Sequence, residues 1–314
     1  YVQMQEECFN VGQTYELCLR AFGELDVIHE EQITDDKMNG YDILVMADVK
    51  MLPREVAKHI AAFVKRGGVV ISDCVPQSDS YFAPLESMKE LFGVKAAATN
   101  RVEQKGTWNP FSMLPAKWAF VKEAPAVPVK TYDQAQGKAY NQNLSFRVIT
   151  PRNCVATDAQ IITSLKSGFP LLLSRKVGKG SCYLFGFCLQ DTYFQTWMDN
   201  DITSRTELQQ LMHDVFASTG IVSRVYSSNP DIEAGVRLHG NEAYCFIINH
   251  EAENAITDVT LRDLGFEVGQ IMDVEWGRTV DFVRTPDGGI RLTIMAVEGT
   301  PTGVTRLLKI TPKK

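Results

Sequence analysis

Two short apolar runs flank an amphipathic segment between residues 43 and 73. Residues 43–47 and 69–71 are continuously apolar, and the second run is rich in β-branched side chains. Unbroken runs of this length are typical of strands buried on both faces, as in a parallel sheet. Between them, apolar residues recur at the spacing of one helical face: Val56, Ile60, Phe63 and Val64. The pattern predicts a strand–helix–strand unit with a right-handed crossover.

The ends of the predicted helix carry the expected signals. Pro53 suits a first helical turn, where its missing N–H is not needed. Lys65 and Arg66 lie at the negative end of the helix dipole, and Gly67-Gly68 can form the left-handed turn that ends the helix.

Further elements of the same kind occupy the first two thirds of the chain. Short strands are predicted at residues 2–5 and 25–28, with a helical apolar stripe between them that ends at Gly23. Residues 170–174 and 182–187 read as two strands joined by a turn at 178–180. The fold class predicted for residues 1–222 is an α/β domain built on a parallel sheet.

The pattern changes at two places. Residues 94–150 are rich in proline and tryptophan and lack periodicity, so we expect an irregular insertion there. Helical periodicity disappears after Ser223, and short alternating runs separated by turn residues follow. Residues 223–314 are therefore predicted to form a small β-sandwich domain.

Several stretches resemble one known family. Residues 41–45, 63–71, 91–94 and 175–186 are similar to the middle domain of glycoside hydrolase family 42 β-galactosidases, and residues 246–250 are similar to their C-terminal β domain. The resemblance implies that residues 1–222 form a flavodoxin-like, class I glutamine-amidotransferase-like domain that mediates trimerisation. Those enzymes carry their paired carboxylates on a TIM barrel, and this sequence does not show the pattern of eight βα units that such a barrel requires. We therefore expect either a barrel upstream of Tyr1 or a stand-alone relative without one.

Composition and charge narrow the function classes. The net charge of −6 argues against nucleic acid or an anionic membrane as a partner. No apolar run approaches the roughly 20 residues that span a bilayer. The seven cysteines are scattered without paired spacing, which is typical of free thiols. This favours a reducing, cytoplasmic compartment and leaves a periplasmic location open.

The sequence offers little catalytic chemistry. Cys74 follows a predicted buried strand, as a nucleophile would, but no neighbouring glycine permits the strained turn that exposes a nucleophile. We therefore interpret it as a structural thiol. The five histidines lack the spacing of metal ligands, so neither a metal nor another cofactor is expected.

Two groups of residues are candidate ligand or interface positions. Asp48, Asp73 and Asp79 lie near predicted strand ends, where open α/β sheets bind ligands, although acidic residues also solvate loop tips. The other group consists of aromatic side chains that stack on sugars, anchor interfaces or pack in cores: Trp108, Trp118 and Trp197.

The function that the sequence favours is a non-catalytic assembly or accessory portion of a β-galactosidase-like protein in carbohydrate metabolism. Two alternatives stay open: a stand-alone carbohydrate-binding protein, and an enzyme with chemistry at the carboxyl edge of the sheet. The expected partners are the chain itself, as a homo-oligomer and in particular a trimer that buries part of residues 108–118, and a carbohydrate.

Overall fold

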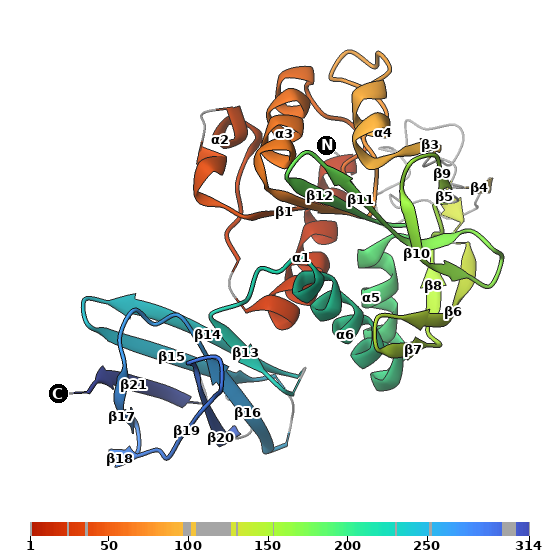
Figure 1. Cartoon of the computed structure of the whole chain (residues 1–314). Helices are drawn as coiled ribbons and strands as arrows, with labels where there is room; N and C mark the ends of the chain where they lie inside the picture. Colours follow the sequence, from red (N-terminus) through yellow and green to blue (C-terminus); the bar gives the residue numbers. More distant parts are fainter. Residues whose placement is uncertain are drawn as a thin grey trace, which may run out of the picture. The chain divides into compact units, whose positions relative to one another are not determined.

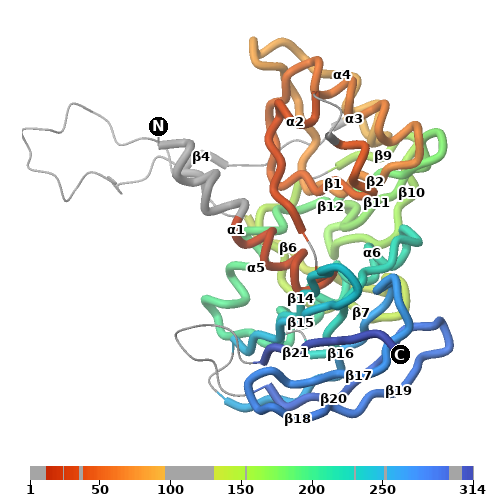
Figure 2. The backbone as a smooth tube through the Cα atoms, turned by 90° about the vertical axis from the view of Figure 1, so that its left-hand side faces the viewer, coloured from red at the N-terminus to blue at the C-terminus, as the bar shows by residue number. Residues whose placement is uncertain are grey.

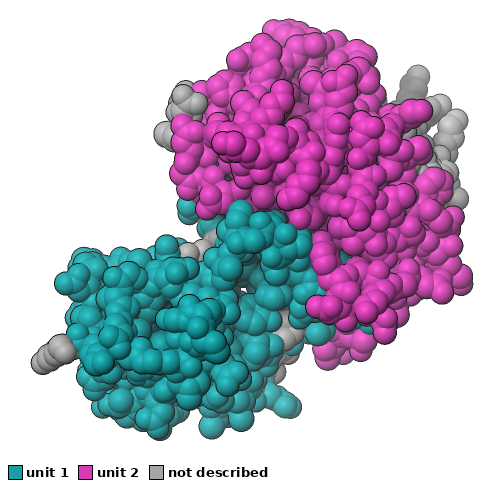
Figure 3. Space-filling view, viewed as in Figure 1, with its two compact units in different colours: residues 1–29, 205–314 teal, residues 30–204 magenta. Residues whose placement is uncertain are grey.

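The computed structural model describes residues 2–23, 25–34, 37–96, 102–104, 127–129, 131–152, 154–229, 231–250, 253–296 and 306–313. The chain divides into two compact units, which Figure 3 shows in different colours. The first unit contains residues 1–29 and 205–314, and the second contains residues 30–204.

The second unit is built on one eight-stranded sheet. The strand order is β1-β2-β12-β11-β10-β6-β7, and β8 pairs with β6. Figure 1 shows β1, β12 and β11 side by side, and Figure 2 labels β2 beside them. The strands are β1 (Ile43–Met46), β2 (Val69–Ser72), β6 (Tyr132–Ala139), β7 (Gln142–Leu144), β8 (Arg147–Ile149), β10 (Gln160–Leu165), β11 (Pro170–Val177) and β12 (Gly180–Phe185).

The predicted strand–helix–strand unit is confirmed. β1 and β2 pair in parallel, with Ile43 opposite Val69, and helix α3 (Arg54–Arg66) connects them. The apolar stripe of α3 is buried. Gly67 ends the helix at a φ of 131°, and its N–H donates to the carbonyl oxygen of Val64.

The parallel arrangement is confined to one edge of a mixed sheet. Among the described strands of this sheet, β1, β2 and β12 pair in parallel, whereas β11, β10, β6, β7 and β8 form antiparallel pairs. The predicted pairing of the strands at 170–187 is confirmed, with Leu173 opposite Leu184. The predicted α/β class followed by β-sheets is confirmed, but the main sheet is mixed and not parallel, because an apolar run reports burial on both faces and not strand direction.

Part of the predicted insertion is regular. Residues 132–149 contain β6, β7 and β8, which extend the main sheet. Two shorter antiparallel pairs are β3 (Val94–Ala96) with β9 (Val155–Ala156), and β4 (Val102–Gln104) with β5 (Val127–Val129).

The two strands predicted near the start of the chain are wrong. Residues 2–5 belong to helix α1 (Val2–Phe22), which ends at Gly23 with a φ of 94°. Residues 25–28 form no strand, and Val27 is exposed. The Phe22 ring lies 4.8 Å from that of Phe216 on helix α6 (Ile202–Ser218).

The first unit contains two antiparallel sheets around one apolar core. Their orders are β13-β16-β20-β19 and β14-β15-β21-β17-β18. Buried residues alternate with outward-facing ones along most of these strands, and the buried set forms one cluster. The strands are β13 (Val225–Ser227), β14 (Ile232–His239), β15 (Glu242–Asn249), β16 (Ala255–Leu261), β17 (Val268–Asp273), β18 (Arg278–Thr279), β19 (Val283–Arg284), β20 (Ile290–Ala296) and β21 (Arg306–Pro312).

The change from helices to strands and the division into compact units fall at different places along the chain. Strands replace helices from Val225, close to the predicted boundary, but α1 and most of α6 group with the β-strands. The remaining helices are α2 (Glu30–Thr34), the 3₁₀ helix η1 (Lys37–Gly40), α4 (Glu86–Phe92) and α5 (Leu189–Met198). None of the helices in the described ranges is long and apolar enough to cross a membrane.

Candidate functional site

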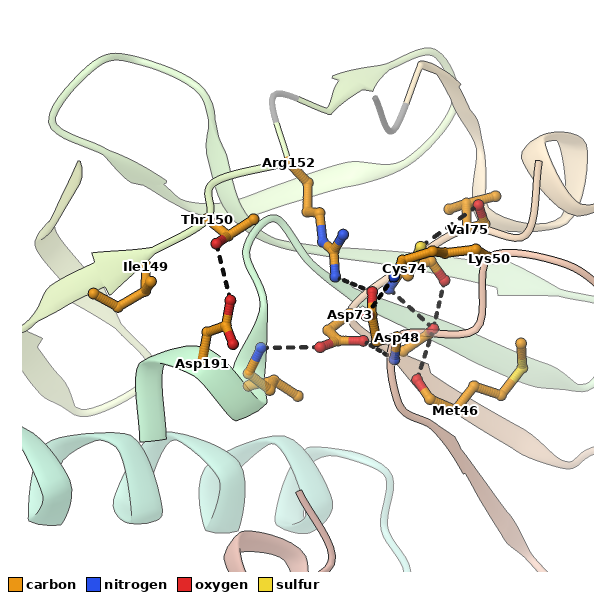
Figure 4. Close-up of polar contacts among 12 residues, drawn as sticks. Met46, Asp48, Lys50, Asp73, Cys74, Val75, Ile149, Thr150, Arg152 and Asp191 are labelled. Carbon is orange, nitrogen blue, oxygen red and sulfur yellow. Dashed lines mark hydrogen bonds and ion pairs between the residues drawn. The ribbon is translucent and has the colours of Figure 1, made fainter. Parts of the chain in front are cut away.

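Three parallel strands bring their carboxyl ends to the same edge of the main sheet. Asp48 follows β1, and Asp73 and Cys74 follow β2. β12 leads at the same edge into Cys188 and the first residue of α5, Leu189. Figure 4 shows the polar contacts of this cluster.

The Asp73 carboxylate joins all three strand ends. Its Oδ1 atom accepts the backbone N–H of Asp48 at 2.6 Å, and its Oδ2 atom accepts the backbone N–H of Leu189 at 2.9 Å. The Leu189 N–H lies at the amino-terminal end of α5, where a negative charge also interacts favourably with the helix dipole. Asp73 therefore takes the place of a local capping side chain for this helix.

Burial is the main influence on the Asp73 carboxyl group. The side chain is fully buried, and burial raises its pKa above the ordinary value, with a further contribution from the charge of Asp48. Arg152 and the two backbone N–H donors oppose this rise without cancelling it. The group is thus an internal anchor whose two oxygens are both occupied.

Arg152 supplies the positive charge of the cluster. It comes from the segment that follows β8, and its side chain is almost completely buried. Its Nη2 atom donates to Asp48 Oδ1 at 2.5 Å, and Lys50 Nζ lies 3.0 Å from Asp48 Oδ2. Burial alone would raise the pKa of Asp48, but Arg152 and Lys50 together lower it below the ordinary value. Asp48 is therefore ionised at neutral pH.

A second set of contacts joins β8 to helix α5. The Thr150 hydroxyl donates to Asp191 Oδ2 at 3.0 Å, and the Ile149 N–H donates to Thr192 Oγ1 at 3.0 Å. With Asp73, these bonds hold the first turn of α5 from two sides (Figure 4).

Cys74 has the properties of a structural thiol. It is buried, and burial raises its pKa to about 12. The thiol is therefore protonated at neutral pH and is a poor nucleophile. Cys74 also lacks a positive φ, and no helix follows it directly, so the strained strand-to-helix turn of a nucleophile is missing here.

The structure places the remaining predicted residues elsewhere. The Asp79 carboxylate accepts from Arg54 Nε at 2.5 Å and from two backbone N–H groups in its own loop, and these contacts lie outside the cluster of Asp48 and Asp73. Trp197 lies half-buried on α5, with its ring edge-on to Tyr193 at 6.4 Å. Trp108 and Trp118 lie outside the described residues.

Sequence reasoning brought together Asp48 and Asp73 but missed Arg152. The predicted strand ends indicate where Asp48 and Asp73 meet. Arg152 lies in a stretch without periodicity, so no sequence pattern indicates that it is buried. The described residues contain no group of three or more His, Cys, Asp or Glu side chains placed to hold a metal ion.

Comparison with known sequences finds one short similarity to a glycoside hydrolase. No family model matches the sequence. An exo-β-D-glucosaminidase from Thermococcus kodakarensis is 34% identical over 71 residues, which are 22% of this chain and 9% of that protein.

Solved structures resemble almost the whole chain. A β-galactosidase from Bacillus circulans sp. alkalophilus matches 96% of this chain with a TM-score of 0.62 and 15% identity. Gan42B, a GH42 β-galactosidase from G. stearothermophilus, matches 95% with a TM-score of 0.59 and 14% identity. The chain shares its fold with part of these enzymes. An α-L-fucosidase isoenzyme 2 from Paenibacillus thiaminolyticus also matches 96%, with a TM-score of 0.60 and 10% identity.

These likenesses cover a minor share of each larger protein. The chain corresponds to 38% of the B. circulans β-galactosidase, 35% of Gan42B and 45% of the fucosidase. At 10–15% identity, they establish the fold of this chain and not an activity.

Proposed function

We propose that this chain is a non-catalytic assembly and accessory portion of a glycoside-hydrolase-related protein that acts in carbohydrate metabolism. The observation that carries the proposal is the closed carboxyl edge of the parallel strands. Asp48, Asp73, Cys74 and Arg152 are all buried there, and they contact one another or the backbone.

The polar groups at the carboxyl edge of the parallel strands have the properties of stabilising groups more than those of catalytic groups. A general acid or base works best with a pKa near the operating pH and within reach of a substrate. The Cys74 thiol has a pKa of about 12, and the pKa of Asp48 lies below its ordinary value. Both oxygens of Asp73 are used to hold strand and helix ends together. These properties weigh against an enzyme with chemistry at this edge.

The comparisons support the carbohydrate part of the proposal. The fold neighbours above are glycoside hydrolases by name, and this chain matches only a minor part of each. We further propose that the α/β portion is an amidotransferase-like assembly domain of the family 42 type and that the chain forms a homo-oligomer, specifically a trimer. The parallel group β1-β2-β12 is compatible with that domain type.

The proposal predicts that the purified chain of 314 residues does not hydrolyse glycosides by itself. We expect the aryl alcohol to be released from aryl β-galactosides, aryl β-glucosaminides and aryl α-fucosides no faster than in buffer. The reason is that the buried edge of the sheet offers no accessible acid–base pair. Release should be followed by absorbance across gel-filtration fractions.

Turnover that co-elutes with the chain would contradict the non-catalytic assignment. Asp73→Asn provides the matched test of the sheet edge, provided that circular dichroism shows the variant to be folded. Turnover lost in that variant would assign chemistry to the edge.

A further inference from the structure

One outer face of the β-sandwich in the first unit has open space beside an aromatic ring. β14 and β15 lie at one edge of the five-stranded sheet, and Figure 1 shows them side by side. Along both strands, core-facing residues alternate with outward-facing ones. Gly235 and Phe246 both face outward and lie directly opposite each other. We use the name Gly235 surface for these two residues and their outward-facing neighbours Glu233, Arg237 and Tyr244.

Gly235 leaves this surface open. A Cβ atom added at this position would meet no heavy atom within 4 Å. The φ of Gly235 lies outside the left-handed region, so the backbone does not require glycine there. Glycine inside a strand weakens the strand, and it often marks a place where a ligand approaches the backbone closely. The space over Gly235 therefore indicates a binding site and not a requirement of the fold.

Aromatic side chains lie on one side of this space. Phe246 is opposite Gly235, and Tyr244 is two residues away from Phe246 on the same face of β15. The Tyr244 hydroxyl donates to Glu242 Oε2 at 3.0 Å, and Lys309 Nζ lies 2.8 Å from Glu242 Oε1. These contacts hold Tyr244 in place, so the aromatic side of the surface is formed before any ligand arrives.

Hydrogen-bonding side chains lie at both ends of the space. Glu233 and Arg237 flank Gly235 along β14 and face the same way. Glu233 Oε2 accepts from His250 Nε2 at 2.9 Å, and Arg237 Nη1 donates to the carbonyl oxygen of Val236 at 3.2 Å. At about 3.4 Å per residue, the two flanking positions are about 14 Å apart. One sugar ring fits between them.

We propose that the Gly235 surface binds a neutral carbohydrate, with one pyranose ring over Gly235 and its apolar face against Phe246. This inference rests on the carbohydrate part of the proposed function and gives it a location in the chain. A pyranose has an apolar C–H face, which suits an aromatic ring. Its hydroxyl groups both donate and accept hydrogen bonds, which suits Arg237 and Glu233. Small-molecule sites commonly combine apolar and aromatic side chains with a few polar groups that fix the orientation of the ligand.

The charges around the surface favour a neutral ligand. Glu233 would repel an acidic sugar, and Arg237 would repel a basic one. Among the described residues of β14, β15 and β21, the outward-facing Asp, Glu, Lys and Arg side chains balance as two carboxylates and two cations: Glu233, Glu242, Arg237 and Lys309.

The substitution Gly235→Val tests the site in the full chain. Valine is favourable in strands and fills only open space here, so the variant should unfold at the same temperature as the wild type or higher. The branched side chain occupies the volume assigned to the sugar, so the affinity should fall about tenfold or more. Thr260→Val, at an outward-facing position of the other sheet, is the matched control and should bind as the wild type does.

Isothermal titration calorimetry measures the affinity for neutral and charged probes. The neutral probes are lactose, cellobiose and N,N′-diacetylchitobiose, and the charged probe is digalacturonate. At least one neutral probe should bind with a dissociation constant below about 10 mM, and digalacturonate should bind more weakly. Phe246→Leu keeps an apolar side chain but removes the aromatic face, so it should weaken binding about fivefold. This second variant tests the site even if Gly235→Val does not fold.

The outcomes separate this site from the function on which it rests. Equal affinity in the wild type, Gly235→Val and Phe246→Leu would overturn the Gly235 surface and leave the carbohydrate part of the proposed function intact. Tighter binding of digalacturonate than of every neutral probe would overturn the neutral ligand. A wild type that binds none of the four probes at about 10 mM would overturn the site and the carbohydrate part of the proposed function together.

Discussion

Replacing Asp73 with Ala is expected to lower the free energy of unfolding of the second unit by about 3–5 kcal/mol. The substitution leaves the backbone N–H groups of Asp48 and Leu189 buried without their acceptor. Each unsatisfied buried group costs about 1–3 kcal/mol, and the Arg152 guanidinium loses a nearby negative charge. Asp73→Asn should cost less, because its amide oxygen can still accept one of the two N–H groups.

Urea unfolding followed by circular dichroism measures this effect. Asp158→Asn is the matched control, since Asp158 is largely exposed and pairs with Arg175 at 3.3 Å. Exposed pairs contribute up to about 1 kcal/mol, so the control should change little. An Asp73→Ala variant as stable as this control would refute the anchoring role of Asp73.

Replacing Arg152 with Met is expected to destabilise the unit at pH 7 by about 3–5 kcal/mol. The variant keeps the volume of the side chain but removes a buried partner of Asp48, and Lys50 remains as its other partner. Adding Asp48→Asn should restore part of the loss, because the unpaired carboxylate is then gone. The non-additivity of the two changes measures their interaction.

The stability difference between wild type and Arg152→Met should narrow as the pH falls from 7 to 4. In the wild type the pKa of Asp48 is lowered, so its contribution is complete above the ordinary pKa near 3.8 and is lost only below it. In the variant only Lys50 opposes the effect of burial, so we expect the pKa of Asp48 to rise above its unfolded value. Protonation then favours the folded variant as the pH falls. A constant difference over this range would show that the loss does not come from the Asp48 charge.

The sequence predicted local architecture well where the residues of one element are sufficient to define it. The stripe Val56, Ile60, Phe63 and Val64 and the glycines after it define α3 without reference to the rest of the chain. The positions of Asp48 and Asp73 followed from the same unit, because parallel strands end at a common edge.

Features that depend on distant partners could not be predicted. Residues 25–28 have an apolar pattern, but no neighbouring strand pairs with them, and they form no strand. Arg152 and Asp48 are 104 residues apart in the sequence, and no local pattern around either residue indicates that the two form an ion pair. The Asp79 carboxylate accepts the N–H groups of Tyr81 and Ala83, and the sequence pattern does not indicate these contacts within its own loop.

The mass of the chain in solution tests the central claim most directly. Sedimentation equilibrium between about 1 and 50 µM should give an assembly, with about three times the 35.1 kDa of one chain as the proposed trimer. The apparent mass should fall toward one chain only at the lowest concentrations. A single species of 35.1 kDa throughout this range would contradict the assembly function.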